Sequence, residues 1–262
     1  MHRNNEFFYE TLEYNESLNY LNIDNHFRQV ALNMGGKEVV IPAMIKRSVL
    51  ERCGYFQSFP QHLTVVNSYF NEETETDSTQ QGNNSINTDM FLTPAACLHI
   101  YPMLEGENLS DSIITTKAKV YRYEGDRHDG STRLWDFSVR EIVAVGSERF
   151  VINTLSNIQK EALSYCQELK IEAEVKNATD PFYPSKRNEK IKKIQRINNL
   201  KKELVTNIDG KEVAIASFNI HGTHFSKPFN FDQSGTVVTG CVGFGLERLV
   251  AAIRSQNKQE EN

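Results

Sequence analysis

The pattern of apolar and polar positions divides the chain into helical and extended segments. Apolar residues at helical spacing predict helices over 5–32, 46–56, 147–170 and 246–256. Strand-like apolar runs are 37–45, 116–124, 134–146, 171–178, 212–225 and 235–244. The polar turn "GDRHDGST" joins the second and third of these runs, which predicts an antiparallel hairpin. The order of elements predicts an α+β fold, a mostly antiparallel β-sheet flanked by helices.

Two segments differ from this pattern by their polarity. Residues 71–89 contain almost no large apolar side chain and predict a mobile surface loop inside a single domain, 1–262, because strand-like sequence resumes on both sides. Residues 187–204 predict a basic helix with one apolar face packed on the body: Ile191, Ile194, Ile197, Leu200 and Leu204. Basic side chains project away from that face: Lys186, Arg187, Lys190, Lys193 and Lys202. Such a helix is either a solvated face or a docking surface.

Composition narrows the class of protein. The chain has 262 residues, 39% of them hydrophobic and 24% charged, as is ordinary for a soluble enzyme, and its net charge of −5 argues against a dedicated nucleic-acid binder. With no long apolar run and no signal peptide, we expect a cytoplasmic protein that does not bind membranes. The four cysteines are far apart without a C-x-x-C pair, which favours free thiols or metal ligands over disulfides.

Glycines and an arginine near the C-terminus form a candidate phosphate site. In "TGCVGFGLERLV", Gly243 and Gly245 leave space for a ligand near the backbone, and Arg248 at the helix start suits a phosphate. The segment matches neither a Walker loop nor a dinucleotide fingerprint, and a tight turn that packs a helix onto a sheet explains it equally well.

The predicted hairpin carries a second candidate set. In "VYRYE", the period of two puts Arg122 and Glu124 on one strand face, where they could grip a phosphate and a purine amino group. Trp135 and Phe137 share a face of the second strand. For any single pair, an ordinary salt bridge within a sheet is the more frequent explanation.

Together, these segments resemble the class II aminoacyl-tRNA synthetases. "YRYE" with "LWDFSVRE" is similar to their motif 2, "VGFGLERLVAAI" to motif 3, and "GGKEVVIPAMIKRSVLERCGYFQSFP" to the seryl-type motif 1 with its proline, Pro42. The resemblance covers roughly 35–255. "TPAACLHIYPM", "DPFYPSKRNEK", "KKEL", "SFNIHGTHF" and "GCVGFGLER" narrow it to the truncated seryl-type homologues known as amino acid:[carrier protein] ligases.

The resemblance implies a fold, a reaction and partners. It implies the class II synthetase catalytic fold, formation of an aminoacyl-adenylate from an amino acid and ATP, and transfer of the aminoacyl group to the phosphopantetheine thiol of a carrier protein. A seryl-tRNA synthetase would carry a long N-terminal arm for which this chain has no room, so tRNA is not an expected partner. The resemblance also implies a homodimer formed through the motif 1 region.

The resemblance further implies the site residues. Zn²⁺ would be held by Cys97, Glu141 and Cys241, a set that leaves a fourth position for the substrate's α-amino group. ATP is expected to bind together with Mg²⁺. Arg122 would bind its α-phosphate, Arg248 its γ-phosphate and Glu124 its adenine amino group. Trp135 or Phe137 would stack on the adenine, and Gly243 and Gly245 would leave space for the nucleotide. Arg122 and Arg248 would be catalytic.

Two further sets follow from the resemblance. Asn219 and His221, with His224 beside them, fall where the family lines its amino-acid pocket, and the carrier-binding residues would be Lys186, Arg187, Lys190 and Lys193. Two other functions stay open: a synthetase-derived aminoacyl transferase acting on tRNA or a small molecule, and a non-catalytic paralogue. Intact Arg122, Glu124 and Arg248 argue against the paralogue. The sequence leaves the identity of the amino acid open.

Overall fold

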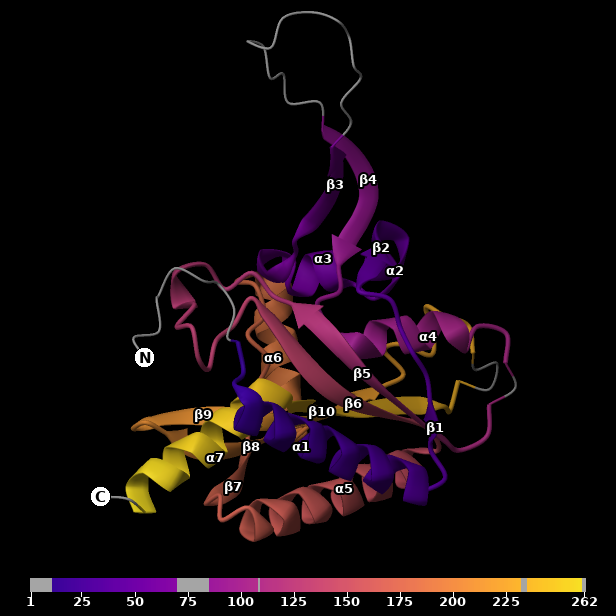
Figure 1. The fold of residues 1–262 in the computed structure, drawn as a ribbon. Helices are drawn as coiled ribbons and strands as arrows, with labels where there is room; N and C mark the ends of the chain where they lie inside the picture. Colours follow the sequence, from indigo (N-terminus) through magenta and orange to yellow (C-terminus); the bar gives the residue numbers. More distant parts are fainter. Residues whose placement is uncertain (1–10, 70–84, 108, 232–234, 261–262) are drawn as a thin grey trace, which may run out of the picture.

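A seven-stranded sheet forms the centre of the molecule in the computed structural model, which describes residues 11–69, 85–107, 109–231 and 235–260 (Figure 1). The strands, in spatial order, are β1 (Lys37–Glu38), β5 (Ser112–Tyr121), β6 (Asp136–Gly146), β10 (Val238–Gly245), β9 (Lys211–Gly222), β8 (Lys201–Ile208) and β7 (Ala173–Asn177). Every neighbouring pair is antiparallel except β1 and β5. The predicted α+β fold with a mostly antiparallel sheet is therefore confirmed.

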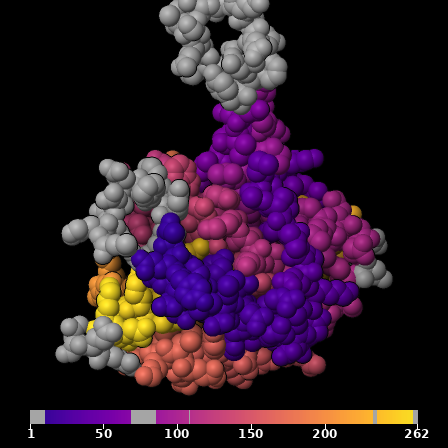
Figure 2. Space-filling model, viewed as in Figure 1, coloured from indigo at the N-terminus to yellow at the C-terminus, as the bar shows by residue number. Residues whose placement is uncertain are grey.

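Three helices cover one face of this sheet: α1 (Tyr14–Asn33), α5 (Glu148–Glu168) and α7 (Leu246–Glu260). In the space-filling view they form a continuous layer over the sheet (Figure 2). Their apolar stripes meet alternate residues of β6 and β10 in one buried cluster, in which Phe27 of α1 stacks on Phe244 of β10 at 3.6 Å between ring centroids. The predicted start of α5 is confirmed, because the Ser147 side chain accepts a hydrogen bond from the Phe150 amide.

The opposite face of the sheet is covered by short elements. They are α2 (Arg47–Arg52), α3 (Tyr55–Ser58), η1 (Pro60–His62), η2 (Ala96–His99) and α4 (Ile100–Met103). A small second sheet adjoins them, ordered β2 (Met44–Lys46), β4 (Ser85–Leu92) and β3 (Val65–Tyr69), and its β3–β4 hairpin projects from the body (Figure 1). No helix in the part of the chain that the structure describes is long and apolar enough to span a bilayer.

Several predicted boundaries were wrong in this region. The apolar run 37–45 is not one strand, because only β1 and β2 at its two ends form ladders. The predicted helix 46–56 is two helices, since Gly54 between them has a left-handed φ of 67°. Of the predicted loop 71–89, residues 85–89 belong to β4, and residues 71–84 lie outside the described residues.

The hairpin prediction holds in its pairing but not in its length. β5 and β6 are antiparallel as expected, yet β5 ends at Tyr121. Arg122 and Glu124 therefore lie in the connection beyond the strand, which continues through η3 (Gly125–Arg127), and the two side chains are not held by strand alternation. The Arg122 amide still donates to the Trp135 carbonyl at 2.9 Å, which keeps both chains together past the end of the ladder.

The basic helix is shorter than predicted and packs differently. Helix α6 covers Lys186–Ile197, and β8 begins at Lys201, so Lys202 and Leu204 belong to the sheet. Asn199 ends the helix in the left-handed region at φ 49°, and the Leu200 amide bonds the Gln195 carbonyl. The predicted packing of the isoleucines is also wrong, because Ile194 is 53% and Ile197 is 63% exposed.

Candidate active site

The face of the sheet opposite the long helices gathers the candidate residues because strand side chains alternate. On β10, Cys241, Gly243 and Gly245 share this face, while Val242 and Phe244 enter the helix-covered core. The strand register then sets their neighbours. Cys241 lies opposite Asn219 of β9, and Gly243 lies opposite Glu141 of β6.

Cys97, Glu141 and Cys241 form a buried cluster at this face. Cys97 comes from η2, which lies over the sheet, and the three ligand atoms lie within 4.8 Å of one another. Burial raises the pKa of Glu141 to about 7. A hydrogen bond with Cys97, together with burial, raises the pKa of the Cys241 thiol. Ionising these buried groups without a counter-charge is costly. A divalent cation would supply that charge, and two thiolates with one carboxylate are a donor set that fits it.

Polar side chains from β9 border the cluster. Asn219 Nδ2 lies 3.6 Å from Cys241 Sγ, and His221 Nε2 lies 3.7 Å from the same sulfur. The other ring nitrogen of His221 contacts Thr239 Oγ1 at 3.1 Å and Tyr101 Oη at 3.4 Å. Burial lowers the pKa of His221 to about 3, so its imidazole is neutral at neutral pH. The structure therefore brings Asn219 and His221 to the side of Cys241.

The structure also places His224 and two residues near His221 that the sequence did not predict, Thr239 and Tyr101. His224 Nε2 contacts the Cys53 carbonyl at 3.2 Å and no described contact joins it to the cluster. Sequence reasoning missed Thr239, although its position two residues before Cys241 on the same strand is a usable signal. It also missed Tyr101, whose ring stacks on Phe225 at 3.9 Å, and no local pattern marks that contact.

Arg122 lies at the start of the connection between β5 and β6 and reaches the segment that precedes Cys97. Its Nε donates to the Pro94 carbonyl at 2.9 Å, and its guanidinium lies 5.5 Å from the centre of the Phe137 ring. The positive charge of Arg122 opposes the burial that raises the pKa of Glu141. Pro94 lies three residues before Cys97, so the contact with its carbonyl brings Arg122 to the segment that carries this cluster residue. A ligand that contacts Arg122 is therefore close to the Cys97–Glu141–Cys241 cluster.

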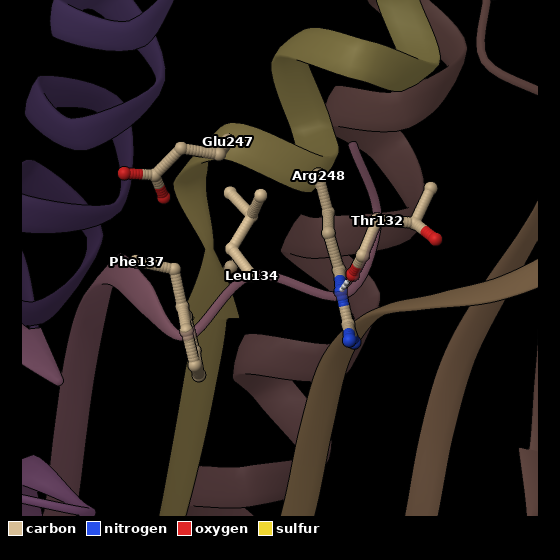
Figure 3. A pocket seen from close by; sticks show the side chains of 6 residues that line it. Thr132, Leu134, Phe137, Glu247 and Arg248 are labelled. Carbon is tan, nitrogen blue, oxygen red and sulfur yellow. Dashed lines mark hydrogen bonds between the residues drawn. The ribbon is translucent and has the colours of Figure 1, made fainter. Parts of the chain in front are cut away.

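Of the two aromatic candidates, Phe137 lies nearer the arginines. Trp135 Nε1 donates to Thr64 Oγ1 at 3.1 Å, and its ring makes an edge contact with Tyr123. Phe137 instead lines a small cavity together with Arg248 (Figure 3). Glu124 is half-buried and pairs with two loop arginines, Arg127 at 3.3 Å and Arg133 at 3.5 Å.

Arg248 at the start of α7 is held by backbone carbonyls. Its Nε donates to the Thr132 carbonyl at 2.6 Å and its Nη1 to the Ala214 carbonyl at 2.9 Å. Burial and the charges of Arg133 and Arg122 lower the pKa of Arg248 to about 10, so the guanidinium stays charged at neutral pH. Figure 3 shows the contact between Arg248 and Thr132. Both residues line a cavity of about 10 Å³, which has room for about one water molecule.

Asp129 determines the shape of the loop that reaches Arg248. Its carboxylate accepts hydrogen bonds from the amides of Ser131, Thr132 and Arg133 at 3.0, 2.8 and 2.8 Å, and from the Thr132 hydroxyl at 2.5 Å. Burial raises the pKa of Asp129, but these hydrogen bonds outweigh it and hold the pKa well below its usual range. The carboxylate thereby presents the Thr132 carbonyl to Arg248.

We expect Asp129→Asn to loosen this loop. Hydrogen bonds to an ionised acceptor are about twice as strong as neutral ones, so amide exchange at Ser131, Thr132 and Arg133 should rise roughly tenfold. Hydrogen exchange measured by NMR or mass spectrometry checks this. Asp126→Asn, an exposed substitution in the same loop, is the matched control. Unchanged exchange in the Asp129 variant would contradict the assignment.

Helix α6 carries all four predicted carrier-binding residues. Lys186, Arg187, Lys190 and Lys193 are exposed, and the twelve residues of the helix contain six basic side chains and one acidic side chain, Glu189. Two polar side chains attach the helix to the body. The buried Asn188 Nδ2 donates to the Gln57 and Tyr183 carbonyls at 2.7 and 2.8 Å, and Gln195 Nε2 donates to Asp180 Oδ2 at 2.7 Å.

Comparison with known proteins identifies the family. A Bradyrhizobium diazoefficiens protein named amino acid–[acyl-carrier-protein] ligase 2 is 30% identical over 227 residues, which are 81% of this chain and 67% of that protein. The chain belongs to the amino acid:[carrier protein] ligase family of class II synthetase homologues. Ligase 1 of the same organism is 29% identical over 235 residues, 84% of this chain and 71% of that protein. No protein-family model matches the chain.

Seryl-tRNA synthetases are about as distant in sequence from this chain as the two carrier-protein ligases are. The type-2 serine–tRNA ligase of Methanocaldococcus jannaschii is 28% identical over 252 residues. The match covers 87% of this chain and 48% of that protein. Among solved structures, M. kandleri seryl-tRNA synthetase bound to A. aeolicus tRNASec superimposes with a TM-score of 0.76 at 22% identity, over 91% of this chain and 52% of that one. Giardia lamblia prolyl-tRNA synthetase superimposes with a TM-score of 0.65 at 14% identity, over 90% of this chain and 46% of that one. These similarities show the class II synthetase catalytic fold.

Proposed function

We propose that this protein activates an amino acid with ATP to aminoacyl-AMP and transfers the aminoacyl group to the phosphopantetheine thiol of a carrier protein. The observation that carries the proposal is the buried Cys97–Glu141–Cys241 cluster on one sheet face, with Arg122 held against the Pro94 carbonyl three residues before Cys97. That arrangement suits a substrate with an amino group at one end and a carboxylate at the other. The ligase and synthetase relatives support amino acid activation as the shared chemistry.

Within this proposal the cluster holds Zn²⁺. Two cysteine sulfurs and one carboxylate are suitable zinc ligands, and three protein ligands leave a fourth position. Bound zinc would supply a Lewis-acidic position that takes the neutral α-amino group of the substrate. Asn219 and His221 border Cys241 and would line the amino-acid pocket next to it.

Arg122 supports the adenylation step. A substrate oxygen attacks the α-phosphorus, the bond to the bridging oxygen breaks, and pyrophosphate leaves with that electron pair. The carboxylate is already ionised at pH 7, so the attack needs no general base. Arg122, oriented by the Pro94 carbonyl and the Phe137 ring, would stabilise the charge that grows on the α-phosphate. Mg²⁺ would accompany the ATP phosphates.

Arg248, Glu124, Phe137 and Gly245 make up the rest of the proposed ATP site. A guanidinium has five N–H donors. The Thr132 and Ala214 carbonyls accept from two of those of Arg248, so a γ-phosphate would bind this guanidinium through its other donors. Glu124 would accept a hydrogen bond from the adenine amino group. Phe137 is favoured over Trp135 for stacking on adenine because it lines the same cavity as Arg248.

In the second step the carrier thiolate attacks the carbonyl carbon of the adenylate, and AMP leaves with the C–O electron pair.

Helix α6 would bind the carrier. Its exposed basic side chains attract an acidic surface, and the exposed Ile194 and Ile197 offer an apolar contact among them. Polar anchors, Asn188 and Gln195, hold the helix so that this surface faces outward. An acidic helix with apolar side chains would match both features.

Homodimer formation through the motif 1 region is part of the proposal. Val40, between β1 and β2, is 95% exposed, and Met44, the first residue of β2, is 44% exposed, so this region presents apolar surface. Sedimentation velocity would measure the assembly, and Val40→Asp should shift it toward the monomer.

The deciding experiment separates activation from transfer. Amino-acid-dependent ATP–pyrophosphate exchange, screened over the amino acids, tests activation and identifies the substrate. Transfer of the labelled amino acid to a phosphopantetheinylated carrier is then compared with transfer to tRNA. Exchange with carrier transfer supports the proposal, preferential tRNA charging supports a synthetase-derived transferase, and absent exchange supports a non-catalytic paralogue.

Reversing charge on α6 should impair only the second step. Lys190→Glu with Lys193→Glu is expected to lower kcat/KM for carrier transfer by about 10-fold or more, since electrostatic steering changes association rates on this scale. Pyrophosphate exchange should be unaffected because both side chains are exposed on α6, away from the buried cluster. Lys160→Glu with Lys211→Glu, two exposed positions on other elements, is the matched control. Equal loss in both steps would exclude α6 as a docking surface.

A further inference from the structure

Gly243 faces Glu141 across the β10–β6 ladder. The two residues are direct partners in an antiparallel register that runs from Val238 opposite Gly146 to Gly245 opposite Val139. A methyl carbon added at Gly243 would lie 3.0 Å from Glu141 Oε2 and 3.7 Å from its Cδ, with Ser217 Oγ at 3.8 Å. Nonbonded heavy atoms are most stable at about 3.5–4.0 Å, so the carboxylate occupies space that a side chain would need.

We propose that Gly243 is a positioning residue for the metal cluster: its missing side chain sets where the Glu141 carboxylate lies. This inference rests on the proposed metal site. It gives Gly243 a role distinct from the expected one of making room for ATP. The backbone itself does not require glycine there, because Gly243 has no positive φ.

The Glu141 carboxylate has little freedom to retreat. Its residue is only 7% exposed, and its ligand oxygen is grouped with the sulfurs of Cys97 and Cys241. A methyl at Gly243 would therefore move the carboxylate by a few tenths of an ångström relative to those sulfurs. Plausible metal–ligand distances vary by about ±0.2 Å, so a displacement of this size is sufficient to weaken binding.

The other glycines of β10 have different surroundings. A methyl carbon at Gly245 would lie 3.6 Å from Arg248 Cδ and 3.8 Å from the Ile215 carbonyl oxygen, which are ordinary contacts. One at Gly240 would lie 2.7 Å from Val151 Cγ1, on the helix-covered face, where glycine permits α5 to pack. Among the three, only Gly243 meets a residue of the cluster.

The test compares Gly243→Ala with Gly245→Ala as the matched control. Zn²⁺ affinity, measured by competition with a chromophoric chelator, should fall about 10-fold or more in Gly243→Ala, the scale on which residues that orient metal ligands act. Gly245→Ala should bind Zn²⁺ like the wild type. In a Glu141→Ala background, Gly243→Ala should have no further effect, because the carboxylate through which it acts is gone.

Each outcome bears on a defined claim. A wild-type chain that does not bind Zn²⁺ overturns the metal site and this inference with it. Wild-type affinity in Gly243→Ala, or equal loss in both glycine variants, overturns the positioning role alone. Should Gly243→Ala fold poorly, adding Glu141→Asp withdraws the carboxylate by one methylene and is expected to restore the Tm of the metal-free protein; a Tm that stays low contradicts the proposed contact.

Discussion

Cys241→Ser is expected to remove the metal and with it amino acid activation. The cluster offers three ligand atoms within 4.8 Å, and serine replaces a thiolate ligand with a hydroxyl that stays protonated at neutral pH. Bound zinc should fall from about one equivalent per chain to near none, as measured by elemental analysis. Amino-acid-dependent pyrophosphate exchange should fall about 100-fold or more, because removal of outer partners of metal ligands already costs about 10–100-fold.

The fold should survive this change. Cys241 is buried among residues of the sheet face, and serine is slightly smaller, so the circular dichroism spectrum should be unchanged. Cys166→Ala is the control, because Cys166 is buried on α5 in the helix-covered core and should leave zinc content unaltered. Normal pyrophosphate exchange in Cys241→Ser would exclude Cys241 as a ligand that activation needs.

Arg122→Ala is expected to have the second largest effect. Removing one donor that stabilises transition-state charge costs about 100- to 1,000-fold in kcat, or about 2.7–4 kcal/mol. We propose this role for Arg122 because the Pro94 carbonyl and the Phe137 ring orient its guanidinium, and Pro94 lies three residues before Cys97 of the cluster. Single-turnover formation of the adenylate measures the effect directly, and zinc content should stay at the wild-type level.

Two further variants make the Arg122 result specific. Arg122→Lys keeps the charge but loses the planar fork, so its rate should lie between those of the wild type and the alanine variant. Arg149→Ala removes an exposed arginine on α5 and should leave adenylation unchanged. Adenylation at the wild-type rate in Arg122→Ala would refute the proposed contact with the α-phosphate.

The loop and α7 orient Arg248 before a nucleotide binds. Asp129 holds the turn that presents the Thr132 carbonyl to Arg248 Nε, and the Ala214 carbonyl accepts from Nη1. These two contacts leave other N–H donors of the guanidinium to bind a phosphate. Hydrogen bonds between ionised partners are about twice as strong as neutral ones, so a phosphate is a favourable ligand for this arginine.

Local periodicity predicted most elements whose order comes from near neighbours in the chain. The stripe of α5 with its Ser147 cap, and the strands β6, β9 and β10, were identified because the core face repeats at fixed spacing. Periodicity failed at α6. Ile191, Ile194, Ile197, Leu200 and Leu204 fit a helical stripe, but left-handed Asn199 ends the helix, and Leu204 enters the sheet. Apolar spacing cannot distinguish one long helix from a helix followed by a strand.

By itself the sequence determined the α+β class, the hairpin, the residue types of the site and, through its motifs, the family. Only the tertiary structure decided which of those residues meet. Cys97, Glu141 and Cys241 come from η2, β6 and β10, and no spacing along the chain encodes their approach. It also showed that Arg122 and Glu124 lie past the end of β5 and that Gly243 leaves space for Glu141. The physical reason is that strand register and layer packing, set by long-range contacts, determine distances between side chains, whereas local sequence determines only the direction in which each one leaves its own element.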